Sequence, residues 1–84
     1  MRAEDILPGH TDTVDLHGVT VRKGTVGAFL ANALALRDPA TPLGQRAAAL
    51  RDIEDALPAL AALRLFDVFE LRDPELRAFV GARL

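Results

Sequence analysis

The sequence predicts a small α+β domain, dominated by helices, in which an N-terminal β-hairpin packs on three to four short α-helices. Three observations predict this fold: β-branched residues alternate on both sides of His17-Gly18, apolar residues recur at helical spacing further on, and prolines separate the helical segments. The chain has 84 residues, enough for one small domain. Residues 1–12 show no periodicity and are predicted to form a flexible arm, which leaves residues 13–84 as the domain.

The hairpin is predicted over residues 13–22, with His17-Gly18 as a two-residue turn. Glycine adopts positive φ freely, and histidine is enriched there among the other residues. The turn fixes the register, which pairs Leu16 with Val19, Asp15 with Thr20, Val14 with Val21 and Thr13 with Arg22. The four aliphatic side chains then share one face of the hairpin, and the four polar side chains share the other.

Two helices are predicted after the hairpin. The first begins at Gly24-Thr25, with the Thr25 hydroxyl as its cap, and ends at Asp38-Pro39. The second begins at Thr41-Pro42, with threonine as the cap and proline in the first helical position. Its predicted apolar stripe consists of Leu43, Ala47, Leu50, Ile53 and Leu57.

The rest of the chain is less uniform. Pro58 either kinks the second helix or begins another, and residues 59–63 are predicted to be helical. Residues 65–71 fit a helical turn, an irregular apolar segment or a third strand, and we favour a helical layer over the third strand. Asp73-Pro74 repeats the cap-and-proline pattern and predicts a terminal helix with Leu76, Phe79 and Val80 directed inward.

The tetrapeptide Leu-Arg-Asp-Pro occurs at residues 36–39 and again at 71–74. A structural repeat would show similarity around both copies, and none is present, so we interpret the recurrence as coincidence.

The predicted core combines the apolar face of the hairpin with one face of each helix. Its members are Val14, Leu16, Val19, Val21, Phe29, Leu30, Leu34, Leu50, Ile53, Leu57, Phe66, Phe69 and Phe79.

The first predicted helix carries no charged residue between Thr25 and Leu36. A helix on the surface of a small monomer normally exposes charged residues. Either this helix lies centrally, covered on both sides, or its alanine face lies in an interface. A domain of this size buries only about 60% of its unfolded surface, which favours the interface. The candidate interface residues, drawn also from the uncharged stretch 56–63, are Ala28, Ala31, Asn32, Ala35, Ala59 and Ala62.

A second hypothesis concerns the junction between the hairpin and the first helix. A strand that runs into a helix N-terminus can place basic side chains and free N–H groups around an anion. The candidate ligand-binding residues are Arg22, Lys23, Gly24, Thr25 and Gly27. The junction lacks the spacing of a P-loop or a dinucleotide fingerprint, and a turn glycine followed by a capping threonine explains the same residues.

Catalysis and metal binding are disfavoured by the composition. The sequence has no Cys and no Ser, which removes disulfides, zinc knuckles and the commonest nucleophiles. His10, Asp12, Asp15 and His17 are suitable metal-ligand types but fit no known spacing. The remaining acids fit exposed helix positions and caps. We predict no catalytic residue, no metal and no cofactor.

The charge balance and the absence of long apolar runs bear on partners and compartment. The net charge of −2 disfavours nucleic acid and anionic membranes as partners. The chain shows no signal peptide and no membrane-spanning stretch, which predicts a cytoplasmic protein. Nine Arg against one Lys, with abundant Ala and Leu, is typical of a GC-rich bacterial genome.

Residues 13–26, together with Leu57-Pro58-Ala59-Leu60 and Leu65-Phe66-Asp67, resemble segments of a family of short bacterial proteins of unknown function. The resemblance implies that His17 is a turn residue, because the family usually has Asp-Gly at this turn. It implies no activity.

The residues therefore predict a non-enzymatic protein-interaction or assembly module that acts as a homodimer or higher homo-oligomer. The alternative is a binder of a small anionic ligand, or a weak enzyme, that uses the junction from Arg22 to Gly27.

Overall fold

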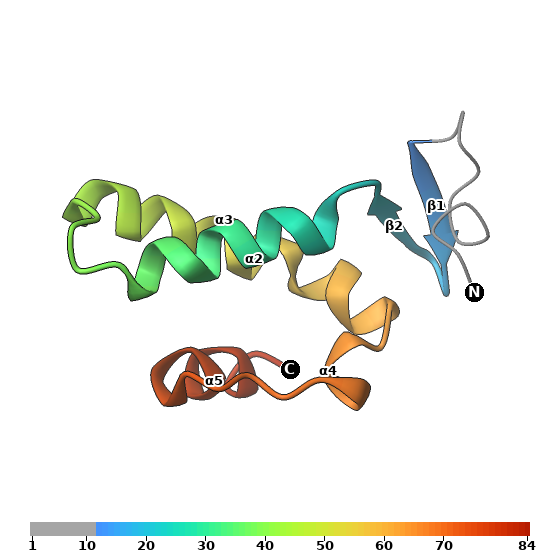
Figure 1. Cartoon of the computed structure of the whole chain (residues 1–84). Helices are drawn as coiled ribbons and strands as arrows, with labels where there is room; N and C mark the ends of the chain where they lie inside the picture. The colour runs from blue at the N-terminus through green and yellow to red at the C-terminus, as the bar shows by residue number, and fades with distance from the viewer. Residues whose placement is uncertain (1–11) are drawn as a thin grey trace.

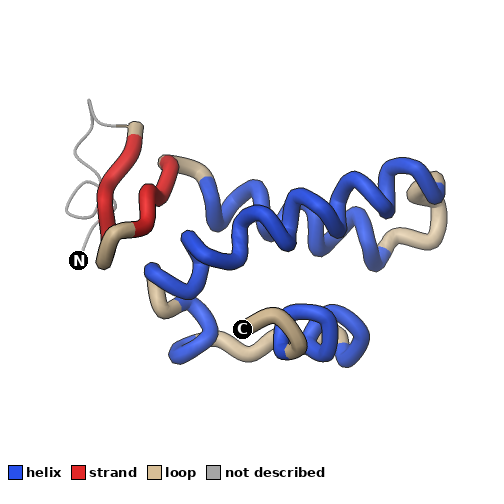
Figure 2. The backbone as a smooth tube through the Cα atoms, turned by 180° about the vertical axis from the view of Figure 1, so that it is seen from behind, coloured by secondary structure: helices blue, strands red, loops and turns tan. Residues whose placement is uncertain are grey.

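The computed structural model describes residues 12–84, so the predicted arm lies outside the described residues except for Asp12. Within this part of the chain, a two-stranded antiparallel sheet is followed by four helices, which confirms the predicted helix-dominated α+β class. The elements are β1 (Thr13–Leu16), β2 (Val19–Arg22), α2 (Thr25–Arg37), α3 (Leu43–Ala62), α4 (Leu65–Val68) and α5 (Pro74–Gly81). Helices α2 and α3 run side by side, with the hairpin beyond one end of the pair and α5 below them in both views (Figures 1 and 2).

The hairpin has the predicted register. The pairs are Thr13–Arg22, Val14–Val21, Asp15–Thr20 and Leu16–Val19. His17 and Gly18 form the turn with φ of 52° and 83°, the positive values that a two-residue turn of this kind requires. Val21 is buried and β2 contacts α3, whereas the other three aliphatic side chains of the hairpin are only half-buried.

Helix α2 begins and ends where the sequence predicts, but its cap differs. Gly24, with φ of 88°, is the residue that precedes the helix, and no side chain caps it. The Thr25 hydroxyl instead donates a hydrogen bond of 2.7 Å to the Arg22 carbonyl oxygen. The predicted Thr25 cap is therefore wrong, because Thr25 already lies inside the helix and its hydroxyl bonds back to the end of β2. Asp38 ends the helix, as expected for a residue before proline.

The connection between α2 and α3 is held by an arginine. Helix α3 begins at Leu43, one residue later than predicted, and no side chain caps it, so the predicted Thr41 cap is also wrong. The Arg46 guanidinium, from the first turn of α3, donates hydrogen bonds to the carbonyl oxygens of Leu36, Asp38 and Thr41. Arg46 thus ties the start of α3 to the end of α2.

Helix α3 continues through Pro58 to Ala62, so the proline neither ends it nor begins a new helix. The described residues contain no third strand; the ambiguous segment forms the single turn α4, followed by extended backbone at Phe69. Helix α5 begins as predicted, with the Asp73 carboxylate accepting a hydrogen bond of 3.0 Å from the Glu75 N–H. The hairpin is therefore accompanied by helices and not by a third strand, as we favoured.

The core lies between the helices. Its buried cluster consists of Phe29, Ile53, Leu57, Leu60, Leu76 and Val80. Ile53 and Leu60 have 0% exposure, and the rings of Phe29 and Phe66 meet edge to face with centroids 5.9 Å apart. The core therefore joins α2, α3 and α5, and α4 contributes Phe66 at its margin.

Several predicted core positions are wrong. Leu30 and Leu34 are exposed at 54% and 66%, because the inward side of α2 is centred on Phe29 and includes Leu36, which leaves these two leucines at its edge and beyond. Phe69 is also 66% exposed, since it follows α4 in the extended segment. In α3 the predicted stripe members Leu43 and Ala47 are exposed, whereas Ala49 and Leu60 are buried.

Candidate functional site

The largest difference from the sequence prediction is the orientation of α2. Its inward side is centred on the buried Phe29, with Val26, Ala33 and Leu36 packed against the core. The opposite side contains Gly27, Leu30, Ala31 and Leu34, all exposed, and we call these four residues the outer face of α2. Their i, i+3, i+4, i+7 spacing forms one continuous stripe along the helix. No charged side chain belongs to this stripe.

The structure separates the six candidate interface residues into two groups. Ala28 and Ala31 are exposed on α2, and Ala31 belongs to its outer face. The other four are half-buried: Asn32, Ala35, Ala59 and Ala62. Among them, Asn32 and Ala59 line a groove between α2 and α3 together with Ala28. The candidate interface residues thus overlap the outer face of α2 only at Ala31, and the exposed Leu30 and Leu34 were not among them.

Three residues of the candidate anion-binding junction have local structural roles. Gly24 has φ of 88°, a left-handed conformation that glycine adopts without a steric penalty. The Thr25 hydroxyl is engaged by the Arg22 carbonyl. Lys23 donates its backbone N–H to the Asp12 carbonyl at 2.6 Å. Gly27 lies one turn further along, on the outer face of α2.

Arg22 and Thr25 also line the groove between α2 and α3, which has a volume of about 540 Å³. The same groove contains the carboxylates of Asp52 and Asp55. Two negative charges beside one guanidinium oppose the binding of an anion there. The junction therefore remains a predicted ligand site with unfavourable local electrostatics.

The histidine and acidic residues considered as metal ligands are not assembled into a site within residues 12–84. His17 is exposed at the hairpin turn, and no group of three or more histidine or acidic residues in that range could hold a metal ion. His10 lies outside the described residues. No helix in the described range is both long and apolar enough to cross a bilayer.

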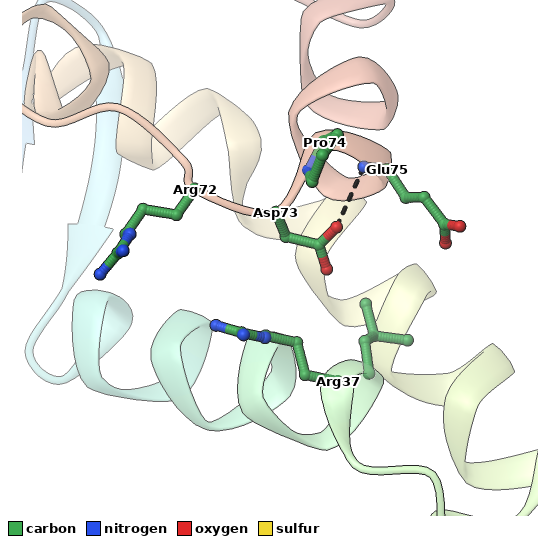
Figure 3. A pocket seen from close by; sticks show the side chains of 6 residues that line it. Arg37, Arg72, Asp73, Pro74 and Glu75 are labelled. Atoms are coloured by element: carbon green, nitrogen blue, oxygen red, sulfur yellow. Dashed lines mark hydrogen bonds between the residues drawn. The ribbon is translucent and has the colours of Figure 1, made fainter.

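Two features escaped sequence reasoning. Val68, Phe69 and Leu84 are exposed at 78%, 66% and 58%, and an open groove of about 400 Å³ lies between the segment after α4 and the end of α5. In addition, the two Leu-Arg-Asp-Pro segments meet around one pocket (Figure 3). The repeated tetrapeptide was itself the signal for this second feature, but only the fold shows that the copies are neighbours.

Comparison of the chain with protein-family models, with curated proteins and with solved structures gives no match.

Proposed function

We propose that this protein is a non-enzymatic interaction module that self-associates through the outer face of α2. The observation that carries the proposal is the exposure of Leu30 and Leu34 at 54% and 66% on a helix whose outer side holds no charge. Contiguous exposed apolar surface of this kind typically marks an interaction site. The absence of Ser and Cys from the sequence supports a role other than catalysis by a common nucleophile.

The energetic gain from covering this face is substantial for a small protein. Full burial of a leucine side chain contributes about 1.5–3 kcal/mol relative to exposure. Leu30 and Leu34 retain more than half of their exposure, so an interface could still recover much of that contribution from both. Ala31 lies between them on the stripe and Gly27 lies just before Leu30, and the small size of these two residues lets another helix approach closely.

A second copy of the chain is the occupant that fits this face best. A two-fold interface brings the same surface patch of both subunits together. Any charge on the patch would then face like charge in the partner, which is destabilising at close range. The outer face of α2 avoids this problem because Gly27, Leu30, Ala31 and Leu34 are all uncharged.

The test is the solution mass of the tag-free chain, measured by light scattering coupled to size exclusion over a concentration series. We expect a mass that rises toward twice 9.0 kDa or a higher multiple. The Leu34→Arg variant should be monomeric, because self-association would bury the new guanidinium in the interface without a partner of opposite charge. Val68→Arg is the matched control, since Val68 is also an exposed aliphatic residue, at 78% against 66% for Leu34, but lies outside the outer face.

A constant mass of 9.0 kDa at every concentration would overturn self-association. Loss of association in Val68→Arg with retention in Leu34→Arg would also overturn the proposal, since it would place the interface at the end of α4.

A further inference from the structure

The pocket in Figure 3 is built from both copies of the repeated tetrapeptide. Its volume is about 550 Å³, and its lining residues are Leu36, Arg37, Arg72, Asp73, Pro74 and Glu75. Leu36 and Arg37 come from the end of α2, and the other four come from the start of α5 and the segment before it. Segments about 35 residues apart in the sequence therefore supply one arginine each to the same pocket.

The aspartates of the two copies share a local conformation. Asp38 has φ and ψ of −79° and 116°, and Asp73 has −75° and 116°. Each aspartate carboxylate accepts a hydrogen bond from the backbone N–H two residues further on, at 2.9 Å from Ala40 and at 3.0 Å from Glu75. Proline favours extended backbone at the residue before it, and aspartate commonly bonds locally in this way. The Asp-Pro part of the tetrapeptide thus builds the same local turn twice, whereas Leu36 and Arg37 are helical and Leu71 and Arg72 are not.

This local bonding leaves the two arginines without a partner inside the described chain. Within residues 12–84, neither the Arg37 nor the Arg72 guanidinium forms an ion pair or a hydrogen bond. The Arg22 and Arg51 side chains also lack such a partner, whereas Arg46 bonds three carbonyl oxygens, and Arg64, Arg77 and Arg83 pair with acids. Arg37 and Arg72 are therefore available to a ligand, and they line one pocket together.

The charges around the pocket favour an anion on its arginine side. In Figure 3 the side chains of Arg37 and Arg72 extend to the same side, whereas Glu75 points away from both. The Asp73 carboxylate is engaged at the N-terminus of α5, where the helix dipole offsets its negative charge. The pocket lining thus holds two arginines and two acids, with both guanidiniums on the side away from Glu75.

We infer that this pocket binds the phosphate group of a small molecule between Arg37 and Arg72. A guanidinium presents a planar fork of donors that matches two oxygens of an anion. A carboxylate has only two oxygens, which one fork already engages, whereas a phosphomonoester offers three oxygens and nearly two negative charges. A phosphate can therefore satisfy both arginines at once. The pocket volume lies within the range of small-molecule sites, which leaves room for an organic part beside Leu36 and Pro74.

The first experiment is a titration of the full chain with inorganic phosphate, followed by ¹H–¹⁵N NMR at constant ionic strength. We expect saturable shifts of the amide signals around residues 36–38 and 72–76. Arg37→Gln and Arg72→Gln should each weaken binding by about tenfold, the usual effect of losing a hydrogen bond to a charged group. Arg51→Gln is the matched control, because Arg51 is an exposed arginine on α3 outside this pocket. Far-UV circular dichroism checks that each variant is folded.

Three results would overturn the inference: no saturable binding, shifts centred on residues 22–27, or an equal loss of affinity in Arg51→Gln. A second titration with acetate and glycerol phosphate tests the ligand class. The inference is supported if glycerol phosphate binds at least as tightly as inorganic phosphate. Tighter binding of glycerol phosphate would identify the ligand class as an organic phosphate, and equal binding would identify it as the free phosphate anion. Acetate as tight as phosphate would overturn it. These outcomes are independent of the mass measurement above, because neither arginine belongs to the outer face of α2.

Discussion

The hairpin and the helices of this protein contribute in opposite ways to the fold. The hairpin obeys local rules closely, with a two-residue turn and a register determined by it, yet it supplies one fully buried side chain, Val21. The helices supply the whole connected core cluster, from Phe29 on α2 to Val80 on α5. The hairpin, whose structure is the easiest to predict from the sequence, is therefore not the part of the chain that supplies most of the core.

The largest effect that tests this comparison comes from truncating one aromatic residue. Phe29→Ala removes a ring that is 2% exposed and packs edge to face on Phe66. We expect it to cost about 3–5 kcal/mol of the free energy of unfolding, a large part of the roughly 4–13 kcal/mol available to a chain of this length. Thermal unfolding followed by circular dichroism should show no cooperative transition, or one at much lower temperature.

The matched change in the hairpin is Val21→Ala. It removes two methyl groups from a side chain that is also 2% exposed, with an expected cost of about 1.6 kcal/mol. The variant should keep a cooperative transition. A loss of stability as large as that of Phe29→Ala would contradict the comparison and would make the hairpin an essential part of the core.

An intermediate effect is expected at Arg46, which belongs to the helical region but acts through polar contacts. Arg46→Ala removes the hydrogen bonds to the carbonyl oxygens of Leu36, Asp38 and Thr41. We expect a loss of about 2–3 kcal/mol, because these bonds have a charged donor and a partly buried setting. Arg46→Lys should recover less than half of it, since an ammonium group cannot reproduce the planar fork.

Chemical denaturation of these variants measures the difference, with Arg51→Ala as the control. Arg51 is exposed on the same helix, so its removal should change stability by no more than about 0.5 kcal/mol. Equal effects at the two positions would show that the Arg46 contacts do not hold the connection between α2 and α3.

The same contrast explains what could be predicted from the sequence. The hairpin register follows from the turn at His17-Gly18. The C-terminal end of α2 and the start of α5 follow from an aspartate that precedes a proline. These signals all act within a few positions of the sequence. The buried face of α2 was predicted only in part: Phe29 is buried as predicted, but Leu30 and Leu34 are exposed. With no charge between Thr25 and Leu36, nothing in the sequence marks which side meets water, and tertiary packing against α3 decides it.

The candidate sites also depend on tertiary packing that the sequence does not predict. The helical spacing of apolar residues predicts Leu30 and Leu34 in the core beside Phe29, whereas both are exposed and belong to the outer face of α2. Arg37 and Arg72 line one pocket because the segment before α5 lies near the end of α2, and no local sequence pattern predicts that placement. Arg46 had the sequence environment of an ordinary surface charge, and only the loop geometry shows its three carbonyl partners.

The smallest expected effect lies at Gly27, on the outer face of α2, and it separates the stability of one chain from the association of two. A Cβ added at Gly27 meets nothing within 4 Å, so the glycine has no packing role inside the described chain. Glycine within a helix costs about 0.5–1 kcal/mol relative to alanine. Gly27→Ala should therefore stabilise the monomer by that amount, measured by thermal unfolding at low protein concentration.

If the outer face packs against a second copy, the same methyl group limits how closely the two helices approach. Gly27→Ala should then weaken the association measured by light scattering while it raises the stability of the monomer. Gly44→Ala is the control, since Gly44 also lies in open space but on α3, and it should leave association unchanged. A Gly27→Ala chain that is more stable and associates as strongly as before would mean that the interface does not require close approach at Gly27, and would move it toward Leu30 and Leu34.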